Sequence, residues 1–142
     1  MIEIDFAFFA RSGGRVEDGA IREAMSTILC IDDEPAGLLP RRLLLESVGY
    51  RVIEARSGKE GIHLFKTEKV DVVILDYWMS GMNGTAVAQE LKNIDPGIPI
   101  IVLSGLTELP GESTGLTDRW FLKGSLRGED LLREIGVLIK RR

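Results

Sequence analysis

Carboxylate side chains follow two of the most apolar runs of the chain, where they could hold a cation and accept a phosphoryl group. Asp32 and Asp33 come directly after "ILCI", and Asp76 comes directly after "VVIL". Two carboxylates about 4 Å apart repel by about 4 kcal/mol at an effective dielectric constant of about 20. A close pair therefore takes up a proton or binds a cation. Oxygen ligands with room for water favour Mg²⁺, and a phosphoryl group can share that ion. Asp76 could then attack phosphorus and form an aspartyl-phosphate.

A hydroxyl and an ammonium group end two further apolar runs. Ser104 follows "IPIIVL" and Lys123 follows "RWFL", and both side chains could contact phosphate oxygens. Taken singly, Asp32 and Asp33 could merely cap a helix. Asp76 alone could be a turn residue, and Lys123 alone a solvated surface charge. Because these polar side chains end four separate runs, their joint occurrence favours one shared site.

The runs that these residues end are predicted β-strands. Five short apolar runs rich in β-forming residues occur along the chain, at 28–31, 51–55, 70–75, 98–103 and 119–122. Stretches with helical spacing separate most of them, as crossovers between parallel strands require. Three of the runs are apolar without alternation, as expected of strands covered on both faces. We therefore expect an α/β domain with a doubly wound five-stranded parallel sheet, in which sites form beyond the carboxyl ends of the strands.

Apolar stripes predict four helices. The first stripe precedes Gly49, a stop signal, and consists of Leu38, Leu39, Leu43, Leu45 and Val48. Ser57-Gly-Lys-Glu60 is typical of a capping box that opens a second helix, which would bury Ile62 and Phe65. The third helix runs over 85–94, and the fourth follows the fifth strand. The inward residues predicted for these two are Val87, Leu91, Ile94, Leu131, Leu132, Ile135, Leu138 and Ile139.

Two places interrupt the regular pattern. The segment "LTELPGESTGLTD" between the fourth and fifth strands contains Pro110, Gly111 and Gly115. These residues work against a helix, so we expect a shortened or irregular element there. Pro40 falls past the first turn of the first helix if that helix begins near Pro35. That helix should therefore start later or bend.

Composition narrows the classes of function. A chain of 142 residues with 44% hydrophobic residues suits one globular domain. The net charge of −4 does not favour nucleic acid or an anionic membrane surface as a partner for the body of the chain. The single cysteine, Cys30, excludes an internal disulfide. No apolar run approaches the roughly 20 residues of a membrane span, and Glu3 and Asp5 stand where a signal peptide would be basic. We expect a cytoplasmic protein.

Residues 1–26 stand apart from the strand and helix pattern. They contain "RSGG" and show no strong period, so we interpret them as an extension outside the domain of residues 27–142. Met25 could be the natural start. In the alternative interpretation, "IEIDFAFF" adds a strand to an edge of the sheet or pairs with a second chain.

Four motifs resemble those of the receiver domain of bacterial two-component response regulators, over residues 27–142. They are "ILCIDDEP", "VVILDYWMSGMNG", "IIVLSG" and "FLKG". The resemblance implies a CheY-like, flavodoxin-like strand order of 2-1-3-4-5. It also implies that Asp76 accepts a phosphoryl group from a phosphohistidine on a sensor histidine kinase or a histidine phosphotransfer protein. Mg²⁺ would be bound by Asp33, Asp76 and the backbone carbonyl of Trp78, with Asp32 acting largely through water.

The same resemblance assigns a switch and reveals departures from the family pattern. Ser104 corresponds to the hydroxyl that moves toward the phosphoryl group, Lys123 to its ion-pair partner, and Trp120 to an aromatic switch residue. The family usually has proline at the positions of Ser80 and Gly124. Their absence should loosen the loop after Lys123 and could shift its side chain.

We therefore expect a phosphorylation-driven switch rather than an enzyme that acts on other molecules. Because only Arg142 follows the last helical pattern, we expect a single-domain regulator that signals to a separate effector protein. Two alternatives stay open. The chain could be a receiver-like interaction module that has lost phosphotransfer, or an aspartyl-phosphate phosphohydrolase, although Trp78 stands where such an enzyme needs a second acid. The pattern also leaves a homodimer open.

Overall fold

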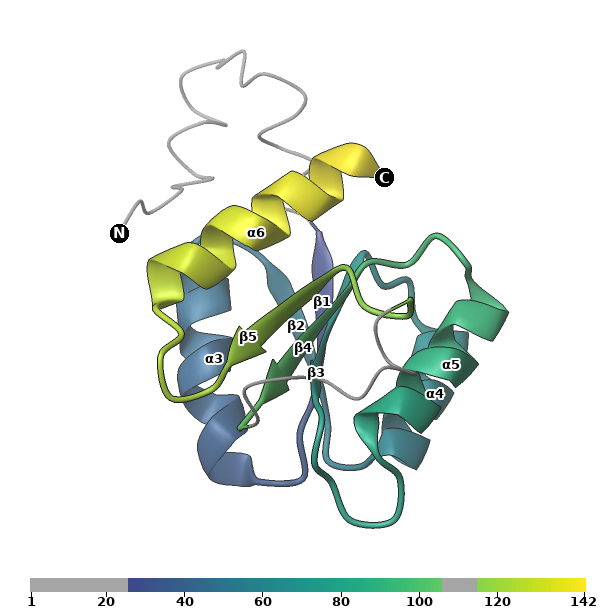
Figure 1. Cartoon of the computed structure of the whole chain (residues 1–142). Coiled ribbons are helices and arrows are strands. Elements are labelled where there is room, and N and C mark those ends of the chain that lie inside the picture. The colour runs from purple at the N-terminus through teal and green to yellow at the C-terminus, as the bar shows by residue number, and fades with distance from the viewer. Residues whose placement is uncertain (1–25, 106–114) are drawn as a thin grey trace.

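A parallel sheet forms the centre of the computed structural model, which describes residues 26–105 and 115–142. The described strands follow the order β2-β1-β3-β4-β5 (Figure 1). Their bounds are β1 Thr27–Ile31, β2 Arg51–Ala55, β3 Val72–Asp76, β4 Ile100–Ser104 and β5 Arg119–Leu122. All neighbouring strands pair in parallel. The predicted fold class and the strand order 2-1-3-4-5 are thus confirmed.

Two strands end one residue later than predicted, with a consequence for the polar residues at their ends. Asp76 is the last residue of β3 and Ser104 the last residue of β4. Backbone hydrogen bonds continue past them, because the Tyr77 amide donates to the Leu103 carbonyl over 2.9 Å and the Lys123 amide to the Ser104 carbonyl over 2.8 Å. The side chains of Asp76 and Ser104 therefore project from a rigid ladder rather than from a loop.

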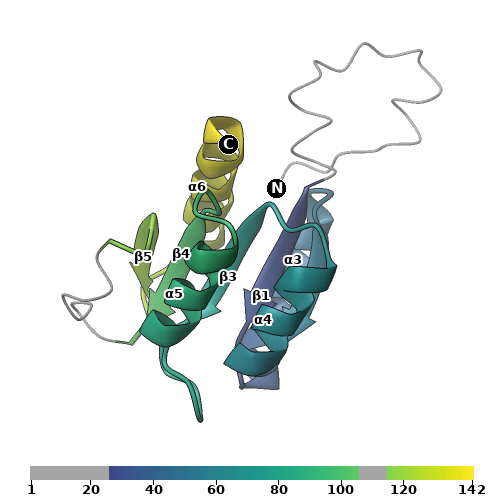
Figure 2. The same cartoon turned by 90° about the vertical axis from the view of Figure 1, so that its right-hand side faces the viewer.

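Helices cover both faces of the sheet. α3 (Pro35–Ser47) and α6 (Gly128–Arg141) lie on one side, and α4 (Gly58–Thr67) and α5 (Gly84–Ile94) on the other (Figures 1 and 2). Alternate residues of the central strands enter two separate apolar clusters: Leu29 and Leu75 pack with the α4 and α5 side, and Ile28 and Ile74 with the α3 and α6 side. Every residue of β1, β3 and β4 is buried. This two-sided burial explains why those runs are apolar without alternation.

The first helix differs from its prediction. It begins at Pro35, so the later start is wrong, and Pro40 lies inside it. Leu38 and Leu45 are buried as predicted, but Leu39 and Leu43 are 58% and 59% exposed. At 3.6 residues per turn, a leucine adjacent to Leu38 along the chain is turned by about 100° away from it, so the two cannot share one inward face.

The other helices follow their predictions more closely. Ser57 caps α4 by accepting a hydrogen bond from the Glu60 amide over 3.0 Å, and Phe65 of that helix is buried. Ile94, at the end of α5, is 41% exposed, so its predicted burial is wrong. The apolar residues predicted for α6 are buried or half-buried.

Two predictions concern segments outside the described residues. The irregular fourth element corresponds mainly to residues 106–114, and the N-terminal extension to residues 1–25. Among the residues that are described, no helix has the length and apolar character to cross a bilayer.

The first residue of α5, Gly84, packs closely against the backbone of Tyr77, the residue after Asp76. The Gly84 amide donates to the Tyr77 carbonyl over 2.7 Å. A Cβ at Gly84 would lie 2.9 Å from the Tyr77 Cα, closer than real Cβ contacts come. At this position glycine is required for helix and strand to approach.

We therefore expect Gly84→Ala to lower the free energy of unfolding by about 1–3 kcal/mol, the usual cost of overpacking. Gly136→Ala is the matched control, because Gly136 lies inside α6 and a Cβ there would meet nothing within 4 Å. That variant should gain up to about 1 kcal/mol from helix propensity. Urea unfolding followed by circular dichroism measures both changes, and equal effects of the two alanines would contradict the close approach.

Candidate functional site at the carboxyl edge of the sheet

Three carboxylates meet beyond the carboxyl ends of β1 and β3. Asp32 follows β1 directly and is fully buried, Asp76 is buried at the end of β3, and Asp33 is half-buried. One oxygen from each of the three lies within 4.8 Å of the others. The fold thus brings together the acids whose sequence positions suggested a shared site.

The Lys123 ammonium lies over these acids. Its Nζ is 3.0 Å from Asp76 Oδ2 and 3.7 Å from Asp32 Oδ2. The described chain contains no cis peptide bond, and glycine follows the lysine where the family usually has proline. Even so, the amide of Lys123 continues the β4–β5 ladder. The Lys123 ammonium contacts Asp76 in this structure, and the loosening of the loop stays a prediction.

Backbone amides hold the two adjacent acids. The Glu34 amide donates to Asp32 Oδ1 over 3.0 Å, and the Ser80 amide donates to Asp33 Oδ2 over 3.0 Å. The N-cap of α3 is Glu34, which makes no side-chain cap, so neither Asp32 nor Asp33 serves as that cap. A proline at position 80 would lack the amide proton that Ser80 donates. The departure from the family pattern therefore supplies a contact to the site.

One carboxylate oxygen marks where a cation would fit. Asp32 Oδ2 is buried and has no hydrogen-bond partner among the described residues. Arg41 and Lys123 lie 3.6 Å and 3.7 Å from it, beyond hydrogen-bond distance, and a buried anionic oxygen without a hydrogen bond is costly. Together with the oxygens of Asp33 and Asp76 it forms an all-oxygen donor set, which is the set that Mg²⁺ prefers. The residues present therefore fit a divalent cation.

The environment of Asp76 changes its acidity. Burial raises the pKa of its carboxyl above the ordinary value of 3.8. The hydrogen bond from Lys123 opposes this rise, and the neighbouring Asp32 carboxylate adds to it. In the absence of a metal ion, burying the charged form of Asp76 therefore costs stability.

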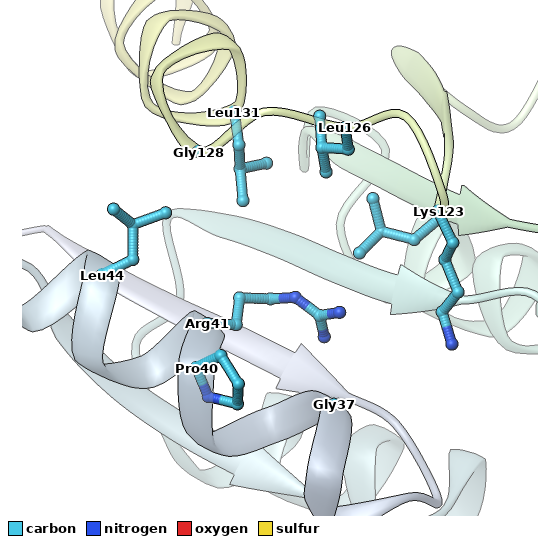
Figure 3. A pocket seen from close by; sticks show the side chains of 9 residues that line it. Gly37, Pro40, Arg41, Leu44, Lys123, Leu126, Gly128 and Leu131 are labelled. Atoms are coloured by element: carbon cyan, nitrogen blue, oxygen red, sulfur yellow. The ribbon is translucent and has the colours of Figure 1, made fainter.

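A second cation, which the sequence analysis did not single out, approaches the acids from α3. Arg41 is only 11% exposed, and its Nη1 lies 3.6 Å from Asp32 Oδ2. It borders a cleft of about 220 Å³ between α3 and α6 that also reaches Lys123 (Figure 3). The signal that could have revealed it is its spacing, since an arginine three residues after Leu38 and four before Leu45 falls on the buried face of the helix.

The remaining predicted residues surround this centre in different ways. Trp78 is 55% exposed, and its ring meets that of Tyr77 edge to face at 4.9 Å between centroids and 87° between planes. Ser104 is fully buried. Trp120 packs against the α4 and α5 cluster, and its Nε1 is buried without a hydrogen-bond partner in the part of the chain described. Trp120 thus faces inward in this structure.

Comparison with known proteins agrees with the fold and the acidic edge. A family model described as the response regulator receiver domain matches residues 28–117. The chain belongs to this family. Receiver domains are signalling switches of two-component systems that interact with sensor kinases and downstream effectors.

Individual relatives cover different shares of their own length. The transcriptional regulatory protein GlrR of Escherichia coli is 40% identical over 83 residues, which are 58% of this chain and only 19% of GlrR. Protein PilH of Pseudomonas aeruginosa is 31% identical over 121 residues, which are 81% of this chain and 98% of PilH. The crystal structure of response regulator TrrA from Thermotoga maritima, in complex with Mg²⁺-BeF, has a TM-score of 0.74 at 29% identity and covers 80% of this chain and 99% of that one.

The donor set leads to a prediction for Asp33. A unit charge about 4 Å away contributes about 4 kcal/mol at a dielectric constant of about 20, so Asp33→Asn should weaken Mg²⁺ binding at least about tenfold. Glu34→Gln removes an equal charge from the adjacent exposed residue and should change the affinity far less. Tryptophan fluorescence during a Mg²⁺ titration measures both. Equal weakening by the two variants would mean that Asp33 contributes only to the general field.

The raised pKa of Asp76 predicts a pH-dependent stability difference. Between the unfolded and the folded pKa of this carboxyl, the native state binds more protons, so stability falls as the pH rises. Asp76→Asn removes the buried charge and should raise the free energy of unfolding at pH 7 in Mg²⁺-free buffer. The gain should shrink as the pH falls through the folded pKa of Asp76 toward 3.8. Denaturant unfolding at several pH values tests this, and a variant less stable than the wild type at pH 7 would show that the Lys123 contact outweighs burial.

Proposed function

We propose that this receiver domain accepts a phosphoryl group on Asp76 from a phosphohistidine, in a Mg²⁺-dependent reaction, and passes the signal to a separate effector protein. The observation that carries the proposal is the position of Asp76, which ends a rigid strand 3.0 Å from Lys123 and beside two further acids. The donor would be a sensor histidine kinase or a histidine phosphotransfer protein.

The proposed ligands of Mg²⁺ are the carboxylates of Asp33 and Asp76 and the backbone carbonyl of Trp78, with Asp32 acting through water. When bound, the ion neutralises negative charge on the phosphoryl oxygens. The complex of TrrA with Mg²⁺-BeF and the buried oxygen of Asp32 that accepts no hydrogen bond from the described residues both support an ion at this edge.

The chain's own residues would then carry the transfer. A carboxylate oxygen of Asp76 attacks phosphorus, the bond from phosphorus to the histidine nitrogen breaks, and the electron pair of that bond stays on the imidazole. Lys123 contacts an oxygen of the transferred group with its ammonium. The reaction requires ionised Asp76, which the Lys123 contact favours against the effect of burial.

The new charge would be converted into a change of surface. Phosphorylation adds about −1.5 to −2 charges, and the Ser104 hydroxyl, at the end of the neighbouring strand, is the proposed first group to respond. Ser104 pairs with Leu122 of β5, and Trp120, two residues earlier on that strand, pairs with Val102 of β4. A movement of Ser104 coupled to Trp120 would alter the surface around β5 and the segment before it.

The effector is proposed to be a protein rather than nucleic acid or a membrane, in agreement with the net charge of −4. We place the exchange in the cytoplasm, as the sequence led us to expect. Self-association remains compatible with this scheme, and no enzymatic action on other molecules is part of it.

The two alternatives have less support from the site. A module that has lost phosphotransfer would not need the lysine to lie 3.0 Å from Asp76. A phosphohydrolase of the aspartyl-phosphate type needs an acid two residues after the nucleophile, and that position carries the half-exposed Trp78.

Incubation with acetyl phosphate, with and without Mg²⁺, followed by intact mass measurement, tests the proposal. We expect a gain of one phosphoryl group that requires Mg²⁺ and is abolished in Asp76→Asn, because the amide cannot act as the nucleophile. Asp71→Asn is the matched control. Asp71 precedes the other end of β3, and the amide oxygen can still accept the hydrogen bond from the Thr27 amide.

The remaining outcomes separate the alternatives. No mass gain in a folded protein that binds Mg²⁺ would favour the interaction module. Release of phosphate in many turnovers, dependent on Asp76 and without accumulation of the modified chain, would favour a phosphohydrolase.

A further inference from the structure

Arg41 brings a second positive charge to the acidic edge from within the core. Its side chain is 11% exposed, and its Nη1 is buried without a hydrogen-bond partner among residues 26–105 and 115–142. The nearest anionic atom is Asp32 Oδ2, at 3.6 Å. The same oxygen lies 3.7 Å from Lys123 Nζ. Asp32 is therefore held between two cations, neither of which is close enough for a hydrogen bond.

Packing alone does not require an arginine at this position. Leu38 and Leu45, on the same face of α3, fill the core with apolar side chains, and leucines 44, 126 and 131 line the cleft that Arg41 borders (Figure 3). Burying a guanidinium is costly unless it is well paired. The adjacent Arg42 illustrates good pairing, with Glu46 at 2.9 Å and Glu54 at 2.8 Å. Arg41 has no comparable pair.

The charge of Arg41 changes the electrostatics that a metal ion encounters. Three ionised carboxylates with Lys123 alone would carry a net charge of −2, and Arg41 reduces this to −1. A guanidinium is a fixed cation at any physiological pH, and a site of low dielectric screens it weakly. A divalent cation is therefore attracted less strongly, and it must share Asp32 with a side chain that is already in place.

We propose that Arg41 limits the Mg²⁺ affinity of the site by competing with the ion for Asp32. The inference rests on the proposed Mg²⁺ site. It adds that Arg41 neutralises part of the negative charge of the three acids in the unphosphorylated domain. The fraction of sites that hold Mg²⁺ then varies with the Mg²⁺ concentration, whereas a tighter site would be saturated at a low Mg²⁺ concentration. Gly37 makes the competition possible, because a Cβ there would lie 2.5 Å from Asp32 Oδ2. Because Gly37 has no Cβ, α3 can lie close to Asp32, and Arg41 on this helix is then near the acid.

A Mg²⁺ titration of arginine variants tests the proposal. The chain has two tryptophans, so a Trp120→Phe background leaves Trp78, two residues after Asp76, as the only indole reporter. We expect Arg41→Met and Arg41→Gln to bind Mg²⁺ at least about tenfold more tightly, because each removes the competing charge. Arg41→Lys should stay within about threefold of the parent, since it keeps the charge.

Arg42→Met is the matched control, since it removes the same charge from the next residue of α3, where the guanidinium pairs with Glu46 and Glu54. Its Mg²⁺ affinity should be close to that of the parent. Circular dichroism establishes that each variant is folded. Because Arg41 is replaced by both Met and Gln, the test can still be made if one of these two variants does not fold.

The outcomes distinguish this inference from the function on which it rests. If the parent binds Mg²⁺ and folded Arg41→Met and Arg41→Gln bind it equally or more weakly, Arg41 is a structural residue and the proposal is wrong, while the metal site stands. If neither the parent nor any variant binds Mg²⁺, both the metal site and the inference are wrong. The proposal about Arg41 is supported if the Met and Gln variants bind Mg²⁺ more tightly than the parent, while Arg41→Lys and Arg42→Met keep the affinity of the parent.

Discussion

The mutual repulsion of three carboxylates in one water-poor corner is the constraint on which the site depends. Asp32 and Asp76 are buried, and one carboxylate oxygen of each lies within 4.8 Å of a carboxylate oxygen of Asp33. Lys123 offsets part of the repulsion, and two backbone amides offset another part. Arg41 offsets a further part, and Asp32 Oδ2, which lies 3.6 Å and 3.7 Å from the two cations, accepts no hydrogen bond from the described residues. The negative charge that remains on the three acids is what a divalent cation, and then a phosphoryl group, can use.

The sheet tolerates three acids at its edge because the packing of its two faces does not depend on those acids. The strands that present Asp76 and Ser104 are covered by apolar clusters on both sides. Burial of apolar surface contributes about 25 cal/mol per Å², and the buried residues of these clusters supply no carboxylate or ammonium group to the site. The cost of crowding acids at the strand ends is thereby separated from the interactions that hold the strands in register. Groups placed at the ends of such strands keep their mutual distances.

Helix α3 packs against the sheet and also contributes a charged residue to the acidic site. Its outward face carries Leu39 and Leu43, and its inward face carries Arg41 between the two core leucines. Gly37 lets the helix lie against Asp32. One helix thus contributes to the core and also sets the charge of the acidic edge. A change in α3 packing would alter the electrostatics around Asp76 without any change in the acids themselves.

The amino-acid sequence by itself determined the five strands, their parallel arrangement and the acids and lysine at their ends. These are local signals, because an uninterrupted apolar run and the polar residue that ends it are neighbours in the chain. The rotation of α3 was decided only by tertiary structure, since adjacent leucines fit more than one helical stripe and the stripe that packs depends on the sheet beneath it. Arg41 was therefore missed. The Ser80 amide and Asp33 are 47 residues apart, and the 3.0 Å between Lys123 and Asp76 depends on how β3, β4 and β5 align. Such distances arise from packing between segments far apart in the chain, which no local pattern of residues encodes.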